Sequence, residues 1–298
     1  MHLPRLMPAA VTPFDERGRV DGASLARLFA WFCASGCGGV VVAGTTGEGP
    51  SLSAVERRDL IRLAVELAWP EAEVWLGVAT PSLDEAKWLC RQAATAGASG
   101  VLLMGPYYFR GASPTGIQAW YRAVLDASSV PVLLYNFPQM SGAAVDPSFI
   151  HEIVSHPQLA GIKDSSGERE NLTAYRNIFL PEHRLYVGDE TLLVEALGLG
   201  WTGTISGAAN VIAPWLSRAL THTTQAGREV TAELYAPILA ELRRGPQPAL
   251  AKALLAKWGI LSRPDPRLPL EVADAARGQA VDAMLRDRLG NPLQAVTR

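Results

Sequence analysis

The sequence predicts an α/β fold, a (β/α)8 TIM barrel with a C-terminal helical extension. Short apolar runs alternate with amphipathic helical patterns, and eight such units are complete by about residue 222, the number that this barrel needs. Repeated strand–helix units with short loops favour parallel strands joined by right-handed crossovers. A doubly wound sheet is the alternative, but no G-x-G-x-x-G motif follows the first strand.

The predicted strands are short apolar runs bounded by turn residues, which is typical of buried parallel strands. In chain order they cover residues 3–11, 38–43, 74–78, 100–104, 130–135, 159–163, 184–187 and 203–206.

The helices between the strands are predicted from apolar spacing and from their start signals. The apolar residues over 25–32 follow the i, i+3, i+4, i+7 spacing of an amphipathic helix. Capping boxes open the helices at 53–68 and 82–96, and a capping residue before proline opens those at 113–127 and 146–155. The remaining barrel helices are expected at about 168–179, at about 190–199 and from residue 214.

The chain of 298 residues suits one large barrel with additions. We expect the barrel over residues 1–225 and the helical extension over residues 226–298. Within the extension, the proline-containing segments 245–246 and 263–266 are predicted to interrupt the helices.

Composition excludes several classes of protein. The net charge of -2 provides no basic field for nucleic acid or an anionic membrane surface. No stretch approaches the ~20 apolar residues of a membrane span, and His2, Arg5 and Asp15 interrupt any N-terminal apolar run of a signal peptide. An odd count of three cysteines favours reduced thiols and a cytoplasmic location.

Motifs for metal and serine chemistry are absent from the sequence. The five histidines are scattered without an H-E-x-x-H, and Cys33 and Cys37 have no third or fourth ligand nearby in the sequence. No G-x-S-x-G is present. We therefore expect no metal and no other cofactor.

Lys163 ends the apolar run 159–163, where the predicted strand meets its loop. In an α/β barrel the carboxyl ends of the strands form the active site. A desolvated lysine has a lowered pKa and can form a Schiff base with a carbonyl. The alternative is a lysine that extends from the strand end into solvent.

The segment 44–49, Gly-Thr-Thr-Gly-Glu-Gly, follows the second predicted strand. Its backbone N–H groups and hydroxyls can hold an anion, and since the G-K-[ST] of a nucleotide loop is missing, a small carboxylate is favoured. The alternative is a plain turn whose glycines serve only the backbone conformation.

Polar residues follow other strands at the same edge. Tyr135 lies on the strand beside that of Lys163 and can shuttle protons. Asp189 and Glu190 are adjacent, so on an extended segment they point opposite ways and a paired role is not expected. We interpret Glu190 as a charge at a helix N-terminus.

Five motifs occur in the order of a known family: 44–48 (GTTGE), 106–108 (PYY), 135–138 (YNFP), 161–164 (GIKD) and 203–206 (GTIS). Over nearly the whole chain they resemble the dihydrodipicolinate synthase and N-acetylneuraminate lyase family of class I, pyruvate-dependent aldolases. The resemblance implies that pyruvate and an aldehyde are the small-molecule partners and that the assembly is a homotetramer, a dimer of dimers.

The resemblance also implies roles for individual residues. Lys163 matches the lysine that forms the imine with pyruvate, and Tyr135 matches the tyrosine that relays protons. Thr45 matches the threonine that links this tyrosine to a second one. Tyr108 matches that second tyrosine, which is donated across a subunit interface in the family.

The substrate-binding positions follow from the same resemblance. Thr46 matches the residue that holds the pyruvate carboxylate, and Ile205 matches the residue whose carbonyl faces the bound pyruvate. The spacing from Lys163 to Gly188 resembles the synthase branch of the family more than the sialic acid branch.

One position departs from the synthase pattern. Met140 stands where dihydrodipicolinate synthases carry an arginine that binds the carboxylate of the second substrate, and a thioether cannot replace that arginine. Arg110 is a candidate to take over this contact from another loop. We therefore expect cleavage or formation of a 2-keto-3-deoxy sugar acid or a 4-hydroxy-2-oxo acid. The alternatives are dihydrodipicolinate synthase and a non-catalytic oxo-acid binding protein on the same fold.

Overall fold

The structure is a computed structural model that describes residues 5–245 and 247–295. Within these residues, eight parallel strands form one sheet in the order β1-β8-β7-β6-β5-β4-β3-β2. A parallel bridge between Ala9 and Val41 joins the two outer strands and brings the sheet to closure as a barrel. The strands are β1 (Leu6–Pro8), β2 (Gly39–Val42), β3 (Glu73–Val78), β4 (Gly100–Met104), β5 (Val132–Asn136), β6 (Leu159–Asp164), β7 (Arg184–Val187) and β8 (Gly203–Ser206).

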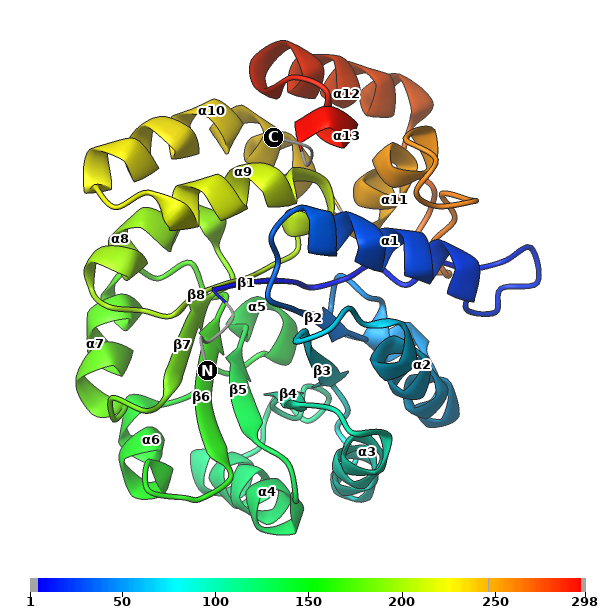
Figure 1. Cartoon of the computed structure of the whole chain (residues 1–298). Coiled ribbons are helices and arrows are strands. Elements are labelled where there is room, and N and C mark those ends of the chain that lie inside the picture. The colour runs from blue at the N-terminus through cyan, green and yellow to red at the C-terminus, as the bar shows by residue number, and fades with distance from the viewer. Residues whose placement is uncertain (1–4, 246, 296–298) are drawn as a thin grey trace.

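Helices surround the barrel (Figure 1) and confirm the predicted fold class. The barrel helices are α1 (Gly22–Ala34), α2 (Ala54–Leu67), α3 (Leu83–Ala96), α4 (Pro114–Ala127), α5 (Pro138–Ser141), α6 (Pro147–Ile153), α7 (Glu170–Ile178), α8 (Leu193–Gly198) and α9 (Ala209–Thr221). Short 3-10 turns occur at η1 (Gly49–Ser51) and η2 (Glu190–Leu192).

The capping residues predicted at the helix starts are found, with one capping box only partly formed. Ser53 caps α2 with both halves of the capping box formed. Ser82 caps α3 by accepting from the Glu85 N–H, but the Glu85 carboxylate pairs with Arg57 of α2 instead of completing the box. The capping box predicted at 82–85 is therefore only half formed, because an ion pair between neighbouring helices competes for the same carboxylate.

Three predicted elements differ from the structure in their bounds. The helix expected from residue 214 begins at Ala209, and the non-helical backbone of Ile212 divides it two residues before the expected start. The strand expected over 3–11 is restricted to Leu6–Pro8 among the described residues. The helix expected over 190–199 is divided into η2 and α8.

The inside of the barrel is filled by side chains, as in other barrels of this type. Buried residues from the strands, among them Met7, Trp75 and Tyr186, form a core separate from the one between sheet and helices. At the amino ends of the strands, the Glu73 carboxylate accepts hydrogen bonds from Trp75 Nε1 at 2.9 Å and from Arg184 Nη1 at 2.6 Å. The space for a ligand is therefore at the opposite, carboxyl end of the strands.

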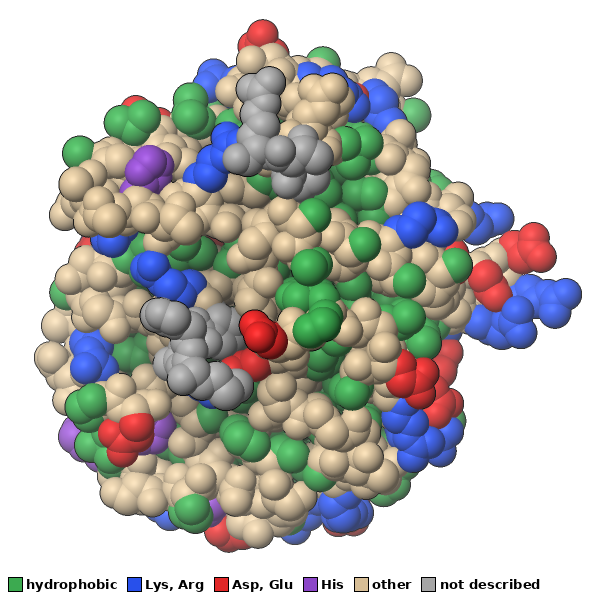
Figure 2. Space-filling view, in the orientation of Figure 1, with side chains coloured by type: hydrophobic (Ala, Val, Ile, Leu, Met, Phe, Trp, Pro, Cys, Tyr) green, Lys and Arg blue, Asp and Glu red, His purple; other side chains and the backbone are tan. Residues whose placement is uncertain are grey.

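The C-terminal extension comprises α10 (Gln225–Arg243), α11 (Gln247–Lys257), α12 (Ala275–Leu289) and α13 (Pro292–Ala295). Helix α10 packs against α9 and α12 and reaches η2 (Figure 1). None of the helices in the described part of the chain is long and apolar enough to span a bilayer. On the face shown in Figure 2, positive and negative side chains are interspersed along the edge of the molecule.

Candidate active site

A cavity of about 360 Å³ opens at the carboxyl ends of the strands. Its walls come from the segments that follow β2, β5, β6, β7 and β8, and from the start of α11 and the end of α10. Two of these segments belong to the C-terminal extension, so the cavity is not built by the barrel alone.

Lys163 lies in this cavity, one residue before the end of β6, with 5 % of its surface exposed. In the sheet it pairs with Tyr135 of β5 and Tyr186 of β7. Its Nζ lies 4.3 Å from the centre of the Tyr135 ring. The side chain is thus enclosed in the cavity, and the alternative of a solvated lysine at the strand end is wrong.

Tyr135 connects the lysine to the segment after β2. Its hydroxyl lies 3.4 Å from the Thr45 Oγ1. Tyr135 is 5 % exposed and Thr45 is half-buried. The structure therefore brings together the three side chains that the sequence associated with imine formation and proton transfer.

Gly188 follows β7 and lies directly against Lys163. A Cβ atom at this position would lie 2.8 Å from the Lys163 Cε and 1.8 Å from the Ser165 Oγ. A glycine is required here because the backbone approaches both side chains closely. The structure gives Gly188 a clear role in the packing of the site.

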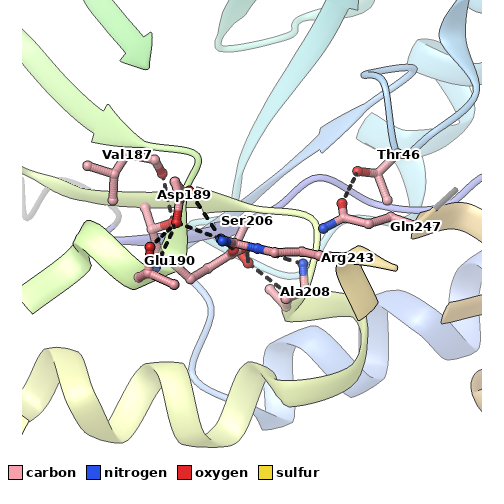
Figure 3. Close-up of polar contacts among 11 residues, drawn as sticks. Thr46, Val187, Asp189, Glu190, Ser206, Ala208, Arg243 and Gln247 are labelled. Carbon is pink, nitrogen blue, oxygen red and sulfur yellow. Dashed lines mark hydrogen bonds and ion pairs between the residues drawn. The ribbon is translucent and has the colours of Figure 1, made fainter. Parts of the chain in front are cut away.

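The glycines of the segment 44–49 also serve close backbone contacts. A Cβ atom at Gly47 would lie 2.7 Å from the Ala10 carbonyl oxygen, and one at Gly49 would lie 1.9 Å from the Ala43 carbonyl oxygen. Glycine is therefore required at these two positions by close backbone packing, and neither has the positive φ that would require it for conformation. Thr46, in contrast, lines the cavity and donates to the Gln247 Oε1 at 3.4 Å (Figure 3).

Glu48 anchors the same segment to the extension. Its carboxylate is paired with Lys252 of α11, and both side chains are fully buried. The second carboxylate oxygen accepts from the Arg267 backbone N–H at 2.7 Å. Desolvation lowers the pKa of Lys252, and the Glu48 charge opposes that effect. The position of Thr45 and Thr46 thus depends on helix α11.

Asp189 and Glu190 both bind one arginine, so the expectation that their side chains point opposite ways is wrong, whereas the absence of a catalytic carboxylate pair stays a prediction. Arg243 donates from Nη2 to Asp189 Oδ1 at 2.6 Å and to Glu190 Oε2 at 2.9 Å, and from Nη1 to Asp189 Oδ2 at 3.2 Å (Figure 3). The backbone is extended at Asp189, but η2 begins at Glu190, and this change of direction lets both carboxylates reach Arg243.

The environment of Asp189 and Arg243 favours the charged forms of both side chains. Burial alone would raise the pKa of the Asp189 carboxyl, but hydrogen bonds from Arg243 and Thr191 outweigh it and hold the pKa below its usual value. Burial lowers the pKa of Arg243, but its hydrogen bond to Asp189 and the charge of Glu190 outweigh burial, so the pKa lies above its ordinary value.

Glu190 is buried and has partners besides Arg243. Its Oε1 accepts from the Ser206 Oγ at 2.6 Å and from the Ala208 N–H at 3.3 Å (Figure 3). The expected charge at a helix N-terminus is therefore found, but the carboxylate also reaches the start of α9. It connects β8 with the end of α10.

Four predicted site residues are not among those that line the cavity. Tyr108 and Met140 are 73 % and 49 % exposed, and Arg110 is exposed beside Gly142. Ile205 is fully buried in the barrel core, two residues before Gly207 of the cavity lining. The roles of these four residues stay predictions.

Arg243 and Gln247 were missed by the sequence analysis. Both lie on the extension, and neither belongs to a motif or to a strand end. The residues that the structure describes hold no group of three or more His, Cys, Asp or Glu side chains arranged to bind a metal.

With this geometry established, comparison with known proteins identifies the family. The model of the dihydrodipicolinate synthetase family matches residues 2–288. The chain belongs to the dihydrodipicolinate synthetase family. Its fold and its lyase class, with a Schiff-base lysine, follow from this membership and confirm the sequence prediction. Membership in this family of lyases also argues against the alternative that the chain is a non-catalytic oxo-acid binding protein.

Curated relatives of the dihydrodipicolinate synthetase family cover the chain almost completely. The 4-hydroxy-tetrahydrodipicolinate synthase of Hyphomonas neptunium is 34 % identical over 286 residues, which are 94 % of this chain and 96 % of the relative. The enzyme of the same name from Synechococcus sp. WH7803 is 32 % identical over 289 residues, or 95 % of each chain.

Solved structures of the family share the architecture. The structure of DHDPS from Cyanidioschyzon merolae with lysine bound has a TM-score of 0.90 at 28 % identity, covering 97 % of this chain and 99 % of that one. The 4-hydroxy-tetrahydrodipicolinate synthase of Methylacidiphilum fumariolicum has a TM-score of 0.90 at 26 % identity, with coverages of 99 % and 98 %.

Proposed function

We propose that the protein is a pyruvate-dependent aldolase in which Lys163 forms the imine and Tyr135 relays protons together with Thr45. The observation that carries the proposal is the enclosed Lys163 Nζ, 4.3 Å from the Tyr135 ring centre, with the Tyr135 hydroxyl 3.4 Å from Thr45. An amine held this way can attack a keto carbon, and the neighbouring hydroxyls can accept and return the proton.

The chemistry in the cleavage direction needs only these groups and water. The Lys163 nitrogen adds to C2 of the 2-oxo acid and water leaves, which gives an iminium ion. As the C4 hydroxyl loses its proton, the C3–C4 bond breaks. The electron pair of that bond forms the enamine, and the C4 fragment departs as the aldehyde. Protonation at C3 and hydrolysis then release pyruvate and the free lysine.

The pyruvate part of the substrate fits the side of the cavity formed by the segment after β2. The Thr46 hydroxyl and the backbone N–H groups of 44–47 are suited to a carboxylate, which lacks donors of its own. We assign the Ile205 carbonyl and Gly188 to the same end of the substrate.

For the substrate, we favour a 2-keto-3-deoxy sugar acid or a 4-hydroxy-2-oxo acid. Met140 stands where the synthases are expected to carry an arginine, and it is half exposed outside the cavity lining. Without that guanidinium, a second carboxylate loses its bidentate partner. The second candidate is 4-hydroxy-tetrahydrodipicolinate synthase, the name borne by relatives of 32–34 % identity.

Borohydride reduction tests the imine. Treatment with pyruvate and borohydride should place the adduct on Lys163, because only an imine is reduced to a stable amine. Lys163→Ala should lose the adduct and turnover, whereas Lys257→Ala, at an exposed lysine of α11, should keep both. An adduct at another residue, or none, contradicts the mechanism.

Steady-state kinetics decide between the two substrate candidates. We expect pyruvate release from a 2-keto-3-deoxy sugar acid or a 4-hydroxy-2-oxo acid, and poor condensation of pyruvate with aspartate semialdehyde. Met140→Arg should improve the use of aspartate semialdehyde. Arg110→Ala tests whether Arg110 binds the carboxylate of aspartate semialdehyde in place of an arginine at position 140. Efficient use of aspartate semialdehyde by the wild type would assign the protein to the synthases.

The proposed assembly is a homotetramer, a dimer of dimers. Tyr108 and Phe109 are 73 % and 70 % exposed, with their rings in an edge-to-face contact at 5.2 Å. Two large aromatic side chains exposed on one loop favour a contact with another copy of the chain. Such a contact is consistent with a Tyr108 hydroxyl that completes a neighbouring site.

A further inference from the structure

The end of α10 forms part of the cavity wall. Arg243 is its last residue, and its side chain, 33 % exposed, binds Asp189 and Glu190 after β7. A helix outside the barrel thus contributes the guanidinium that holds the two carboxylates (Figure 3), in a cavity that Lys163 also lines.

The charges at this wall do not cancel. At their formal charges Asp189 and Glu190 contribute -2 and Arg243 contributes +1, so this side of the cavity has a net charge of about -1. Lys163 lines the same cavity, but in the proposed reaction its nitrogen is part of a neutral enamine when the acceptor binds. A carboxylate on the acceptor would lie against this negative charge in a partly enclosed cavity, where like charges repel more strongly than in bulk water.

Arg243 is not free to clamp a second carboxylate end-on. Its Nη1 and Nη2 already form a two-point contact with Asp189, and Nη2 also donates to Glu190. A guanidinium binds a carboxylate best through two parallel N–H bonds, and this edge is occupied. Single N–H groups remain to donate to a hydroxyl.

Two uncharged polar side chains line the cavity together with Asp189, Glu190 and Arg243. Gln247 accepts from Thr46 through Oε1, and its amide nitrogen makes no hydrogen bond within residues 5–245 and 247–295. Gln139 donates to the Ser166 carbonyl at 2.7 Å, which leaves its Oε1 as an acceptor. Donors and acceptors of this kind match the hydroxyl groups of a short polyol chain.

We infer that Arg243 determines the acceptor specificity of the proposed aldolase. It holds Asp189 and Glu190 in place at a polar wall that accepts an uncharged, hydroxylated aldehyde and disfavours an aldehyde with a carboxylate. The inference rests on the proposed aldolase function and adds a residue of the extension to it.

The test compares Arg243→Met with Arg244→Met, its exposed neighbour that pairs with Glu241. Condensation of pyruvate is measured with glyceraldehyde as the uncharged probe and succinic semialdehyde as the anionic one. Arg243→Met should raise the KM for glyceraldehyde about tenfold or more, as for loss of hydrogen bonds that involve charged groups, while kcat changes little. Arg244→Met should match the wild type.

Asp189→Asn provides a second, smaller change that keeps a polar group of the same shape. It removes one negative charge from the wall, so the ratio of kcat/KM for succinic semialdehyde to that for glyceraldehyde should rise several-fold. An unchanged ratio overturns the inference, as does an unchanged KM for glyceraldehyde in Arg243→Met. If the wild type prefers succinic semialdehyde and Arg243→Met abolishes that preference, Arg243 binds the acceptor carboxylate. This result also overturns the inference.

Imine trapping separates this inference from the proposed function. Arg243→Met and Asp189→Asn should still form the borohydride-reduced pyruvate adduct on Lys163, which also shows that the site is folded. If the wild type forms no such adduct, the aldolase proposal fails. If the adduct forms but selectivity does not depend on Arg243, only the role of Arg243 fails.

Discussion

Replacement of Gly188 by alanine should displace Lys163, the lysine proposed to form the imine, without changing any charge. The added Cβ would lie 2.8 Å from the Lys163 Cε, whereas ordinary contacts begin at 3.4 Å, so the lysine must move by about 0.6 Å. It cannot simply rotate away, because its Nζ already lies 4.3 Å from the Tyr135 ring centre. Gly188 has no positive φ, so the effect comes from contact and not from backbone strain.

The expected cost follows from these distances. A misplacement of about 1 Å at a reacting group can cost about a hundredfold in rate, so we expect kcat to fall about 10- to 100-fold. The added volume should lower the free energy of unfolding by about 1–3 kcal/mol. At a few degrees per kcal/mol, the melting temperature should fall by roughly 2–10 °C.

The assay combines kcat, the rate of borohydride trapping and thermal unfolding. Gly111→Ala is the matched control, since a Cβ there meets nothing within 4 Å and its backbone φ is not positive. The double variant Ser165→Gly/Gly188→Ala removes the shorter contact, 1.8 Å to the Ser165 Oγ, and keeps the one to Lys163. Full activity in the double variant, or unchanged trapping in Gly188→Ala, would refute the reasoning.

Two ion pairs and one exposed tyrosine give further tests. Lys252→Met leaves the buried Glu48 carboxylate unpaired and should lower the free energy of unfolding by about 3–5 kcal/mol. The double variant Lys252→Met/Glu48→Gln should recover part of this loss. If Lys252→Met and the wild type are equally stable in denaturant titrations, the buried charge pair is contradicted. Arg267→Gln should raise the pKa of Glu56 from about 2 toward its ordinary value in an NMR titration. Because the folded-state pKa is depressed, the stability that this pair contributes is present above pH ~4 and is lost as the pH falls toward 2; an unshifted pKa would count against the pair. Tyr108→Ala should reduce turnover and the wild type should be oligomeric by light scattering, so a fully active monomer contradicts the shared site.

The fold and the reactive centre could be predicted because their signals are local. Apolar runs and helix caps fixed the order of strands and helices, and parallel strands carry their carboxyl ends to one edge. Lys163 and Tyr135 therefore had to lie close together once they were placed on adjacent strand ends. The order makes β5 and β6 neighbours, whereas the register that pairs Tyr135 with Lys163 includes a shift between Val132 and Leu133 that local signals do not predict.

The other side of the cavity could not be predicted because it depends on contacts between distant segments. Arg243 lies 54 residues from Asp189 in the sequence, and Gln247 lies 201 residues from Thr46. Helical periodicity indicates which face of a helix is buried, but not what its terminal residues touch. The error about Asp189 and Glu190 has a local cause, since an extended segment was assumed where a 3-10 turn begins.

These contacts imply that the division at residue 225 does not separate two functional units. Arg243 fixes the carboxylates after β7, Gln247 contacts Thr46, and Lys252 neutralises Glu48 at the base of the segment after β2. The extension therefore supplies part of the wall and part of the support for the site. Since Lys163 and Tyr135 lie on the strands, changes in α10 and α11 can alter the acceptor while the imine chemistry of the barrel stays the same.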